Sequence, residues 1–141
     1  MRTRDSIPDP LHLRLSGSTA AHDAVAAARS FSQSAKLDEA SASRLAIIVE
    51  ELVLNLYDHG GLETGDPFEM ELAATRVEVR LALTSPGPEF DPTQSISEGS
   101  ATGAGVGLKL VKTWGRHLKH EYSDGQNRLE LMLPMDRDEQ K

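Results

Sequence analysis

Residues 50–61 limit the possible fold more than any other stretch, because the helix that they predict would carry a polar and an apolar stripe of side chains next to each other. Side chains four residues apart lie nearly in line on a helix, so Glu51, Asn55 and His59 would form one polar stripe. A neighbouring apolar stripe consists of Leu45, Ile48, Val49, Leu52 and Leu56. One face should therefore pack into a core while the next faces a cleft. The plainer alternative is a solvated polar face, as on most surface helices.

The other segments alternate between short strands and amphipathic helices. Asp38 can cap the helix over residues 39–58, and Gly60 and Gly61 should end it. Further helices are predicted over residues 19–36 and 106–117, and strands over 11–15, 68–72, 77–83, 118–123 and 128–133. The turn at Ser85 to Pro88 should break the third of these strands. The order predicts an α+β sandwich with a mostly antiparallel sheet.

Length and composition favour one globular domain over residues 11–134, with a flexible leader (1–10) and a charged tail (135–141). The net charge of −7 argues against nucleic acid as a partner. The absence of cysteine excludes disulfides, thiolate zinc sites and cysteine nucleophiles. No apolar run reaches the length of a membrane span, so we expect a soluble, cytoplasmic protein without a membrane partner.

Three glycines just before the last helix, Gly103, Gly105 and Gly107, suit phosphate binding. Backbone N–H groups can approach an anion closely where Cβ atoms are missing, and a helix N-terminus adds orphan donors and partial positive charge. The pattern is not a dinucleotide-binding fingerprint, since no parallel βαβ unit surrounds it. It is not a Walker A motif either, because Lys109 is misplaced and no Ser or Thr follows it.

The polar stripe can supply what a nucleotide phosphate also needs. Magnesium binds few protein oxygens beside several waters, and the Asn55 amide oxygen is one such ligand. Glu51, one turn earlier, could orient a water or accept a proton from a hydroxyl nucleophile. His59 is more often a helix cap than a catalyst at such a position. His117 and His120 are interpreted as surface or strand residues, because no acidic or cysteine partner has metal-site spacing.

The run Glu51-x-x-x-Asn55-x-x-x-His59-Gly60, the Pro-Gly-Pro turn after a strand and the glycine triplet followed by Leu108 resemble the GHKL ATP-binding fold. Among its members, the chain is most similar to the small anti-sigma-factor serine-protein kinases. The resemblance covers residues 11–134, with Asn127-Arg128-Leu129 in the last strand. It implies a two-layer sandwich with three main helices on one face of the sheet.

The resemblance also implies roles for residues. Glu51 is implied as the general base, Asn55 as the magnesium ligand and residues 89–102 as the ATP lid. The implied nucleotide-binding set is Asn55, Ser85, Gly87, Gly103, Gly105, Gly107 and Leu108. The implied cofactors are ATP and Mg²⁺. The implied partners are an anti-sigma-factor antagonist with a STAS domain, a sigma factor and a second copy of the chain in a homodimer.

One departure from the family pattern leaves two readings open. Ser85 stands where the family has an aspartate that accepts a hydrogen bond from the adenine amino group, and Glu89 replaces a glycine. A neutral hydrogen bond is roughly half as strong as a charge-assisted one. The leading reading is a serine/threonine-protein kinase and anti-sigma regulator. The alternative is a partner-binding module with weakened or lost ATP binding. Apart from these two readings, the ATPase half of a split histidine kinase is a third, which does not depend on this departure.

Overall fold

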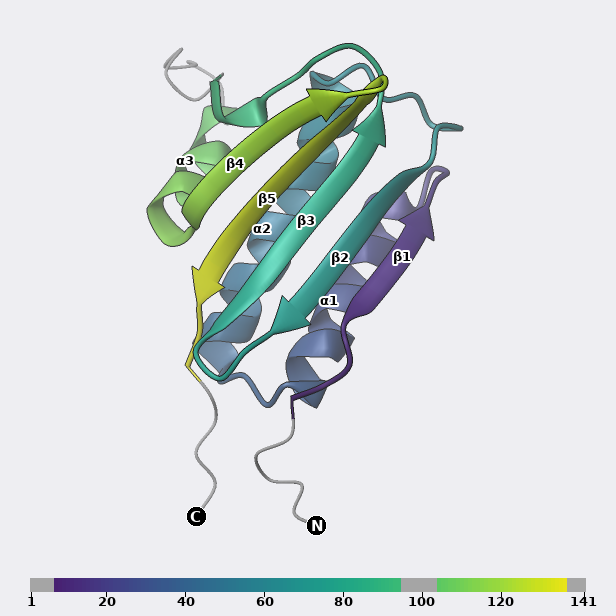
Figure 1. Cartoon of the computed structure of the whole chain (residues 1–141). Helices are drawn as coiled ribbons and strands as arrows, with labels where there is room; N and C mark the ends of the chain where they lie inside the picture. The colour runs from purple at the N-terminus through teal and green to yellow at the C-terminus, as the bar shows by residue number, and fades with distance from the viewer. Residues whose placement is uncertain (1–6, 95–103, 137–141) are drawn as a thin grey trace, which may run out of the picture.

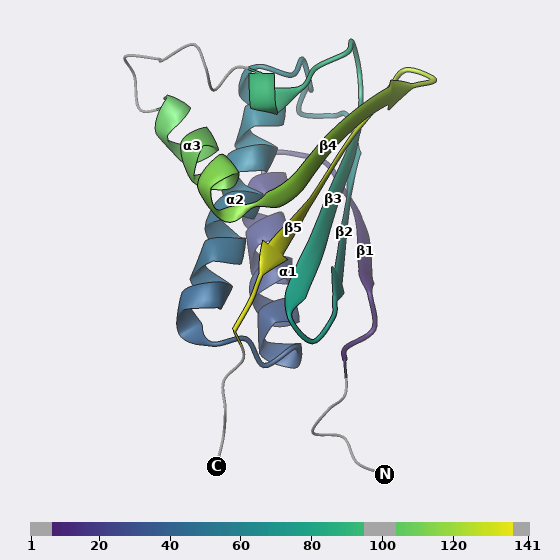
Figure 2. The same ribbon diagram turned by 60° about the vertical axis from the view of Figure 1, so that its left-hand side comes forward.

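The structure is a computed structural model that describes residues 7–94 and 104–136. Figure 1 shows a twisted sheet with α1 and α2 behind it and α3 beside β4, and Figure 2 shows the two layers edge on. In chain order the elements are β1 (Leu11–Leu15), α1 (Ala20–Ser34), α2 (Glu39–Asp58), β2 (Phe68–Ala74), β3 (Glu78–Pro86), α3 (Ala104–Trp114), β4 (Arg116–Ser123) and β5 (Gln126–Pro134). The described helices include none that is both long and apolar enough to span a bilayer.

The sheet has five strands in the order β1-β2-β3-β5-β4, and every neighbouring pair is antiparallel. In β1, β2 and β5 the more buried and the more exposed residues alternate, so the face of the sheet toward the helices is apolar and the other face is more polar. The α+β sandwich with three helices on one face, expected from the sequence, is therefore confirmed. The core between the layers is built around the fully buried side chains Leu45, Ile48, Val49, Leu52, Met70, Leu72, Val79, Leu81, Leu131 and Leu133.

The helix that carries the polar stripe begins and ends where the sequence predicts. Asp38 caps it, with a side-chain oxygen that accepts a hydrogen bond of 2.8 Å from the Ser41 backbone N–H. At the other end, Gly60 N–H donates to the Asn55 and Leu56 carbonyls, and Gly61 has a φ of +79°. Glycine adopts this left-handed conformation without the strain that a Cβ would cause.

Several predicted boundaries are wrong, most clearly those of β3 and α3. β3 does not stop before Ser85 but continues through Pro86, because Ser85 pairs with Asn127 and Pro86 with Gln126 of β5. A proline can occupy the last position of a strand, where its missing N–H breaks little of the ladder. α3 begins at Ala104 rather than at residue 106 and ends at Trp114 rather than at residue 117.

The chain segments next to the sandwich also differ in part from expectation. The Asp124-Gly125 turn between β4 and β5 has positive φ at both residues, +54° and +73°, as a two-residue hairpin requires. Met135, assigned to the charged tail, is buried, and its N–H donates to the Val77 carbonyl. Most of the expected leader (1–6), most of the lid (95–102) and the end of the tail (137–141) lie outside the described residues.

Candidate functional site

Glu51 and Asn55 lie on the side of α2 that faces α3. Arg44 of α2 contacts Trp114 of α3, with its guanidinium carbon 5.8 Å from the ring centroid. A helix returns to within about 20° of the same direction after seven and after eleven residues, so Glu51 and Asn55 point the same way as Arg44. The two helices run in opposite directions (Figure 2). The N-terminal end of α3, with its orphan N–H groups, therefore lies at the same end of the helical layer as the half of α2 that carries Asn55.

Glu51 is half-buried on this side of α2. Burial raises the pKa of this carboxyl above its ordinary value, and the neighbouring Glu50 carboxylate raises it further. Burial disfavours the charged form of an acid, which makes the ionised carboxylate a stronger base. A carboxylate of this kind is suited to accept a proton from a hydroxyl group near neutral pH.

Asn55 is the clearest sign of a ligand site. Its side chain is only 6% exposed, and Nδ2 has no hydrogen-bond partner within the part of the chain that the structure describes. An unpaired buried amide group destabilises a fold by about 1–3 kcal/mol. Such a group is uncommon in native proteins and calls for a physical explanation. A polar ligand or a metal-bound water in contact with the amide would provide one.

The third member of the polar stripe does not join this pair. His59 is the C-cap residue of α2 and is exposed, with its backbone N–H donating to the Asn55 carbonyl. The next residue, Gly60, is buried against Phe90: a Cβ atom on Gly60 would lie 2.9 Å from the Phe90 ring. The end of α2 therefore contacts the segment that follows β3.

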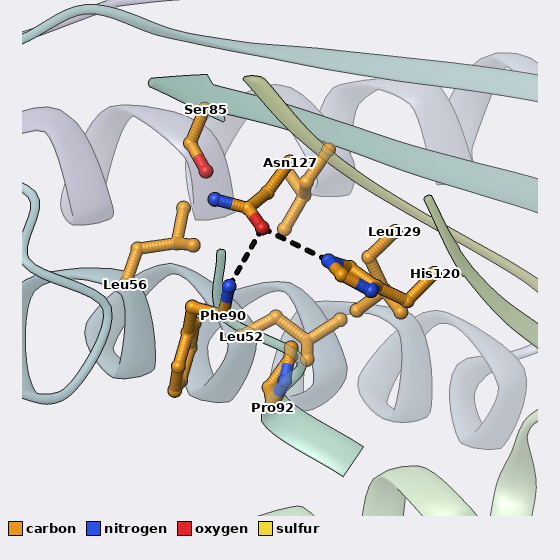
Figure 3. Close-up of a pocket in the computed structure, with 9 residues that line it drawn as sticks. Leu52, Leu56, Ser85, Phe90, Pro92, His120, Asn127 and Leu129 are labelled. Carbon is orange, nitrogen blue, oxygen red and sulfur yellow. Dashed lines mark hydrogen bonds between the residues drawn. The ribbon is translucent and has the colours of Figure 1, made fainter. Parts of the chain in front are cut away.

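Ser85 faces a second part of the site, on the inner face of the sheet. It is 4% exposed and lines a cavity of about 10 Å³. The cavity is lined by Leu52, Leu56, Leu83, Ser85, Phe90, Pro92, His120, Asn127 and Leu129 (Figure 3). Glu51 and Asn55 are not among them, although each directly precedes a lining leucine. A volume of this size holds one water molecule at most.

Asn127 ties the segment after β3 to the sheet. Its Oδ1 accepts a hydrogen bond of 2.8 Å from Phe90 N–H and lies 2.9 Å from His120 Nε2, while its Nδ2 donates to the Pro88 carbonyl at 2.8 Å. Residues 87–94, here called the strap, thus close the cavity beside Ser85. Our interpretation of His120 as a plain surface or strand residue is incomplete, because its ring lines the cavity and contacts Asn127.

Sequence reasoning did not single out Asn127 as a site residue, although a signal was present. In β5, buried and more exposed positions alternate, and Asn127 is the one polar side chain in the buried series that continues with Leu129, Leu131 and Leu133. A polar residue at a core-facing position needs a partner, and so it indicates either a network or a ligand.

Gly87 and the glycine triplet occupy different surroundings. Gly87 has a φ of +125° and follows β3 directly; its N–H donates to the Gly125 carbonyl. Gly105 and Gly107 lie in the first two turns of α3 rather than before it, and Gly103 lies outside the described residues. Leu108, expected to bind nucleotide, is buried in the hydrophobic core.

A magnesium nucleotide fits one end of this site better than the other. The described residues hold no group of three His, Cys, Asp or Glu side chains that could enclose a metal ion. Magnesium does not require one, since one or two protein oxygens suffice when phosphates supply the rest. The unpaired amide of Asn55 and the carboxyl of Glu51 therefore fit the phosphate and metal end. At the base end, the closed cavity beside Ser85 has no room for a nucleobase.

The fold is similar to that of several solved structures, among them the following two. One is the crystal structure of the RsbU and RsbW domains of Rv1364c from Mycobacterium tuberculosis, with a TM-score of 0.69 and 17% identity over 92% of this chain. This chain spans only 33% of that protein chain. The other is the SiaB–SiaC complex from Pseudomonas aeruginosa, with a TM-score of 0.62 and 14% identity over 94% of this chain and 92% of the matched one. Identities this low establish a shared fold alone.

At the level of sequence, no curated protein matches the chain significantly. A family does match: the histidine kinase-like ATPase domain aligns with residues 17–133. The matched region includes α1, α2 and α3 and the strands β2 to β5, apart from Pro134 at the end of β5. The half-buried Glu51, the buried Asn55 and four of the five strands lie inside the matched region, and β1 lies just before it. The chain therefore belongs to the family of histidine kinase-like ATPase domains.

Proposed function

We propose that this chain is an ATP-dependent serine/threonine-protein kinase that acts as a partner-switching, anti-sigma regulator and phosphorylates a STAS-domain antagonist. The observation that carries the proposal is the pair on α2. Glu51 is a half-buried carboxyl with a raised pKa, and Asn55, one turn later, has a buried amide without a partner among the described residues. A base and a metal ligand at this spacing are what phosphoryl transfer to a hydroxyl group requires.

In the proposed reaction, the hydroxyl oxygen of a partner serine or threonine forms a bond to the γ-phosphorus of ATP. The bond from that phosphorus to the bridging oxygen breaks, and ADP leaves. Glu51 accepts the hydroxyl proton. Asn55 would hold Mg²⁺ through its amide oxygen, and the ion would neutralise charge on the phosphates when bound. Backbone N–H groups at the start of α3, together with Gly103, Gly105 and Gly107, are proposed to contact the phosphates.

The two solved structures named above contain more than an isolated domain. One joins an RsbW domain to an RsbU domain, and the other pairs SiaB with SiaC. These arrangements support a role in which this chain also acts on a protein partner. The proposal includes a sigma factor as a second partner and a homodimer as the assembly.

Phosphate transfer from radiolabelled ATP to a purified STAS-domain partner tests the proposal. Glu51→Gln should remove the transfer, because the amide cannot accept the hydroxyl proton. Glu50→Gln is the matched control, since Glu50 is the exposed neighbour on the same helix and should leave the transfer intact. Absence of label on the partner, or equal transfer by both variants, would contradict the assignment.

A second candidate function has its own support. The neutral Ser85 and the closed cavity favour a partner-binding module with weakened or lost ATP binding. Calorimetric titration with Mg-ATP separates the candidates. Micromolar affinity supports the kinase, whereas a lack of binding together with a stable complex with the STAS-domain partner supports the module.

A further inference from the structure

We propose that Asn127 and Tyr122 latch the strap over the cavity beside Ser85, so that a nucleotide base enters only when the strap is released. The inference rests on the proposed function, since it concerns the same nucleotide site. It adds a positioning role for two residues of the β4–β5 hairpin that touch neither Glu51 nor Asn55 in the structure. The latch sets the fraction of molecules that can accept the base.

The carboxamide of Asn127 is held in one orientation. Phe90 N–H requires an acceptor and the Pro88 carbonyl requires a donor, so Oδ1 must face Phe90 and Nδ2 must face Pro88. Because Oδ1 is an acceptor, His120 contributes an N–H at Nε2. Figure 3 shows the amide at the centre of the cavity wall, with the Ser85 hydroxyl pointing toward it. Asn127 is only 4% exposed, so these bonds are shielded from water.

A second attachment holds the start of the strap from outside the cavity. The Tyr122 hydroxyl donates a hydrogen bond of 2.9 Å to the Gly87 carbonyl, and Gly87 N–H donates to the Gly125 carbonyl at 3.1 Å. All of these bonds join the strap to the hairpin of β4 and β5. The strap is therefore attached at both its first residue and its middle to one supporting element.

The closed strap and a bound base cannot occupy the site together. Pockets for small ligands are typically of about 300–1,000 Å³, far above the volume of about 10 Å³ found here. Phe90 and Pro92 form the wall on the strap side, and Ser85 lies on the opposite wall (Figure 3). Room for a base beside Ser85 therefore requires Phe90 and Pro92 to move away. The apparent affinity for a nucleotide is then reduced by the fraction of molecules that are open.

Two variants loosen the strap in different ways. Asn127→Ala removes the three contacts inside the cavity. Tyr122→Phe removes only the bond to the Gly87 carbonyl at an exposed position, and so it should not disturb folding. Ser123→Ala is the control, since this exposed residue ends β4 without a side-chain contact to the described part of the strap.

The first readout is amide exchange without nucleotide. Loss of one hydrogen bond corresponds to roughly a threefold to tenfold change in a local opening equilibrium. Exchange at Phe90 should rise by at least that factor in Asn127→Ala, and exchange at Gly87 should rise in Tyr122→Phe. Exchange equal to wild type in both variants would overturn the latch.

The second readout is Mg-ATP affinity by calorimetry. Tyr122→Phe should bind Mg-ATP roughly threefold to tenfold more tightly than wild type, and Ser123→Ala should not differ from wild type. If wild type binds and the loosened variant binds no more tightly, the latch inference is wrong while the proposed function stands. If exchange accelerates but no variant binds Mg-ATP, the kinase proposal and nucleotide gating both fail.

Discussion

Replacing Asn55 by leucine should make the ligand-free protein more stable and, at the same time, abolish its response to Mg-ATP. The leucine side chain has the same branching and number of heavy atoms as that of asparagine and carries no polar atom, so it removes an unpaired Nδ2 from a position that is 6% exposed. Replacement of a core residue normally lowers the free energy of unfolding of the protein. A gain at this position would indicate a side chain retained for binding rather than for folding.

The magnitude follows from the burial of the amide. Removal of an unsatisfied buried polar group should raise the free energy of unfolding by about 1–3 kcal/mol. Imperfect packing of the leucine methyl groups should cancel part of this gain. We therefore expect a net gain of about 1 kcal/mol in the free energy of unfolding. For a chain of 141 residues this raises the melting temperature by roughly 3–4 °C.

Asn127→Leu is the matched comparison, because Asn127 is equally buried but has partners for both amide atoms. That substitution leaves Phe90 N–H and the Pro88 carbonyl without their partners, so it should lower the free energy of unfolding by about 1–3 kcal/mol. Urea unfolding of both variants and wild type gives the free energies. Thermal unfolding with and without Mg-ATP shows whether the ligand protects each protein.

Two outcomes would refute the reasoning. If Asn55→Leu destabilises the protein as much as Asn127→Leu does, the Asn55 amide has a partner in solution and is part of the folded core. If Asn55→Leu is stabilising but Mg-ATP protects it as well as it protects wild type, the amide is unpaired for a reason other than nucleotide binding.

Three further substitutions test neighbouring parts of the site. Glu51→Gln should be more stable than wild type above pH 4.5, the ordinary pKa of the carboxyl, and should lose that advantage at lower pH. The reason is that the raised pKa makes the native state of wild type hold its proton more tightly than the unfolded state does. A difference in the free energy of urea unfolding that does not change with pH would contradict this. Gly60→Ala should destabilise the fold by about 1–3 kcal/mol, since its Cβ would lie 2.9 Å from the Phe90 ring, whereas Gly65→Ala, with open space around it, should have little effect in the same assay. Ser85→Asp should tighten Mg-ATP roughly tenfold relative to Mg-GTP, by restoring a charged acceptor for the adenine amino group; calorimetry that finds no gain in ATP selectivity would favour the partner-binding module.

The fold could be predicted largely because its signals are local. Helix α2 has the expected bounds, since its capping aspartate and its terminating glycines act within one turn of the helix ends. The alternation of apolar residues likewise identified which face of each strand is buried. The phosphate end of the site was visible for the same reason, because Glu51 and Asn55 are neighbours on one helix.

The base end of the site could not be predicted, because it depends on long-range register. Proline and glycine after Ser85 are typical of the end of a strand, yet pairing with β5 extends β3 through Pro86. The position of His120 depends on an irregularity between Arg116 and Lys119 in β4, where His117 adopts a φ of +56°. A backbone distortion of this kind changes which face the following side chains occupy. Local sequence patterns carry no information about it.

The two ends of the site affect stability in opposite directions. The amide of Asn55 destabilises the ligand-free protein, whereas the strap bonded to Asn127 and Tyr122 stabilises it. A nucleotide that satisfies the amide must first separate the strap from the hairpin. The net free energy of nucleotide binding is therefore the gain from satisfying the amide minus the cost of releasing the strap. Because the strap is bonded to β4 and β5 rather than to α2, a protein partner that displaced this hairpin could change nucleotide affinity without contact with Glu51 or Asn55.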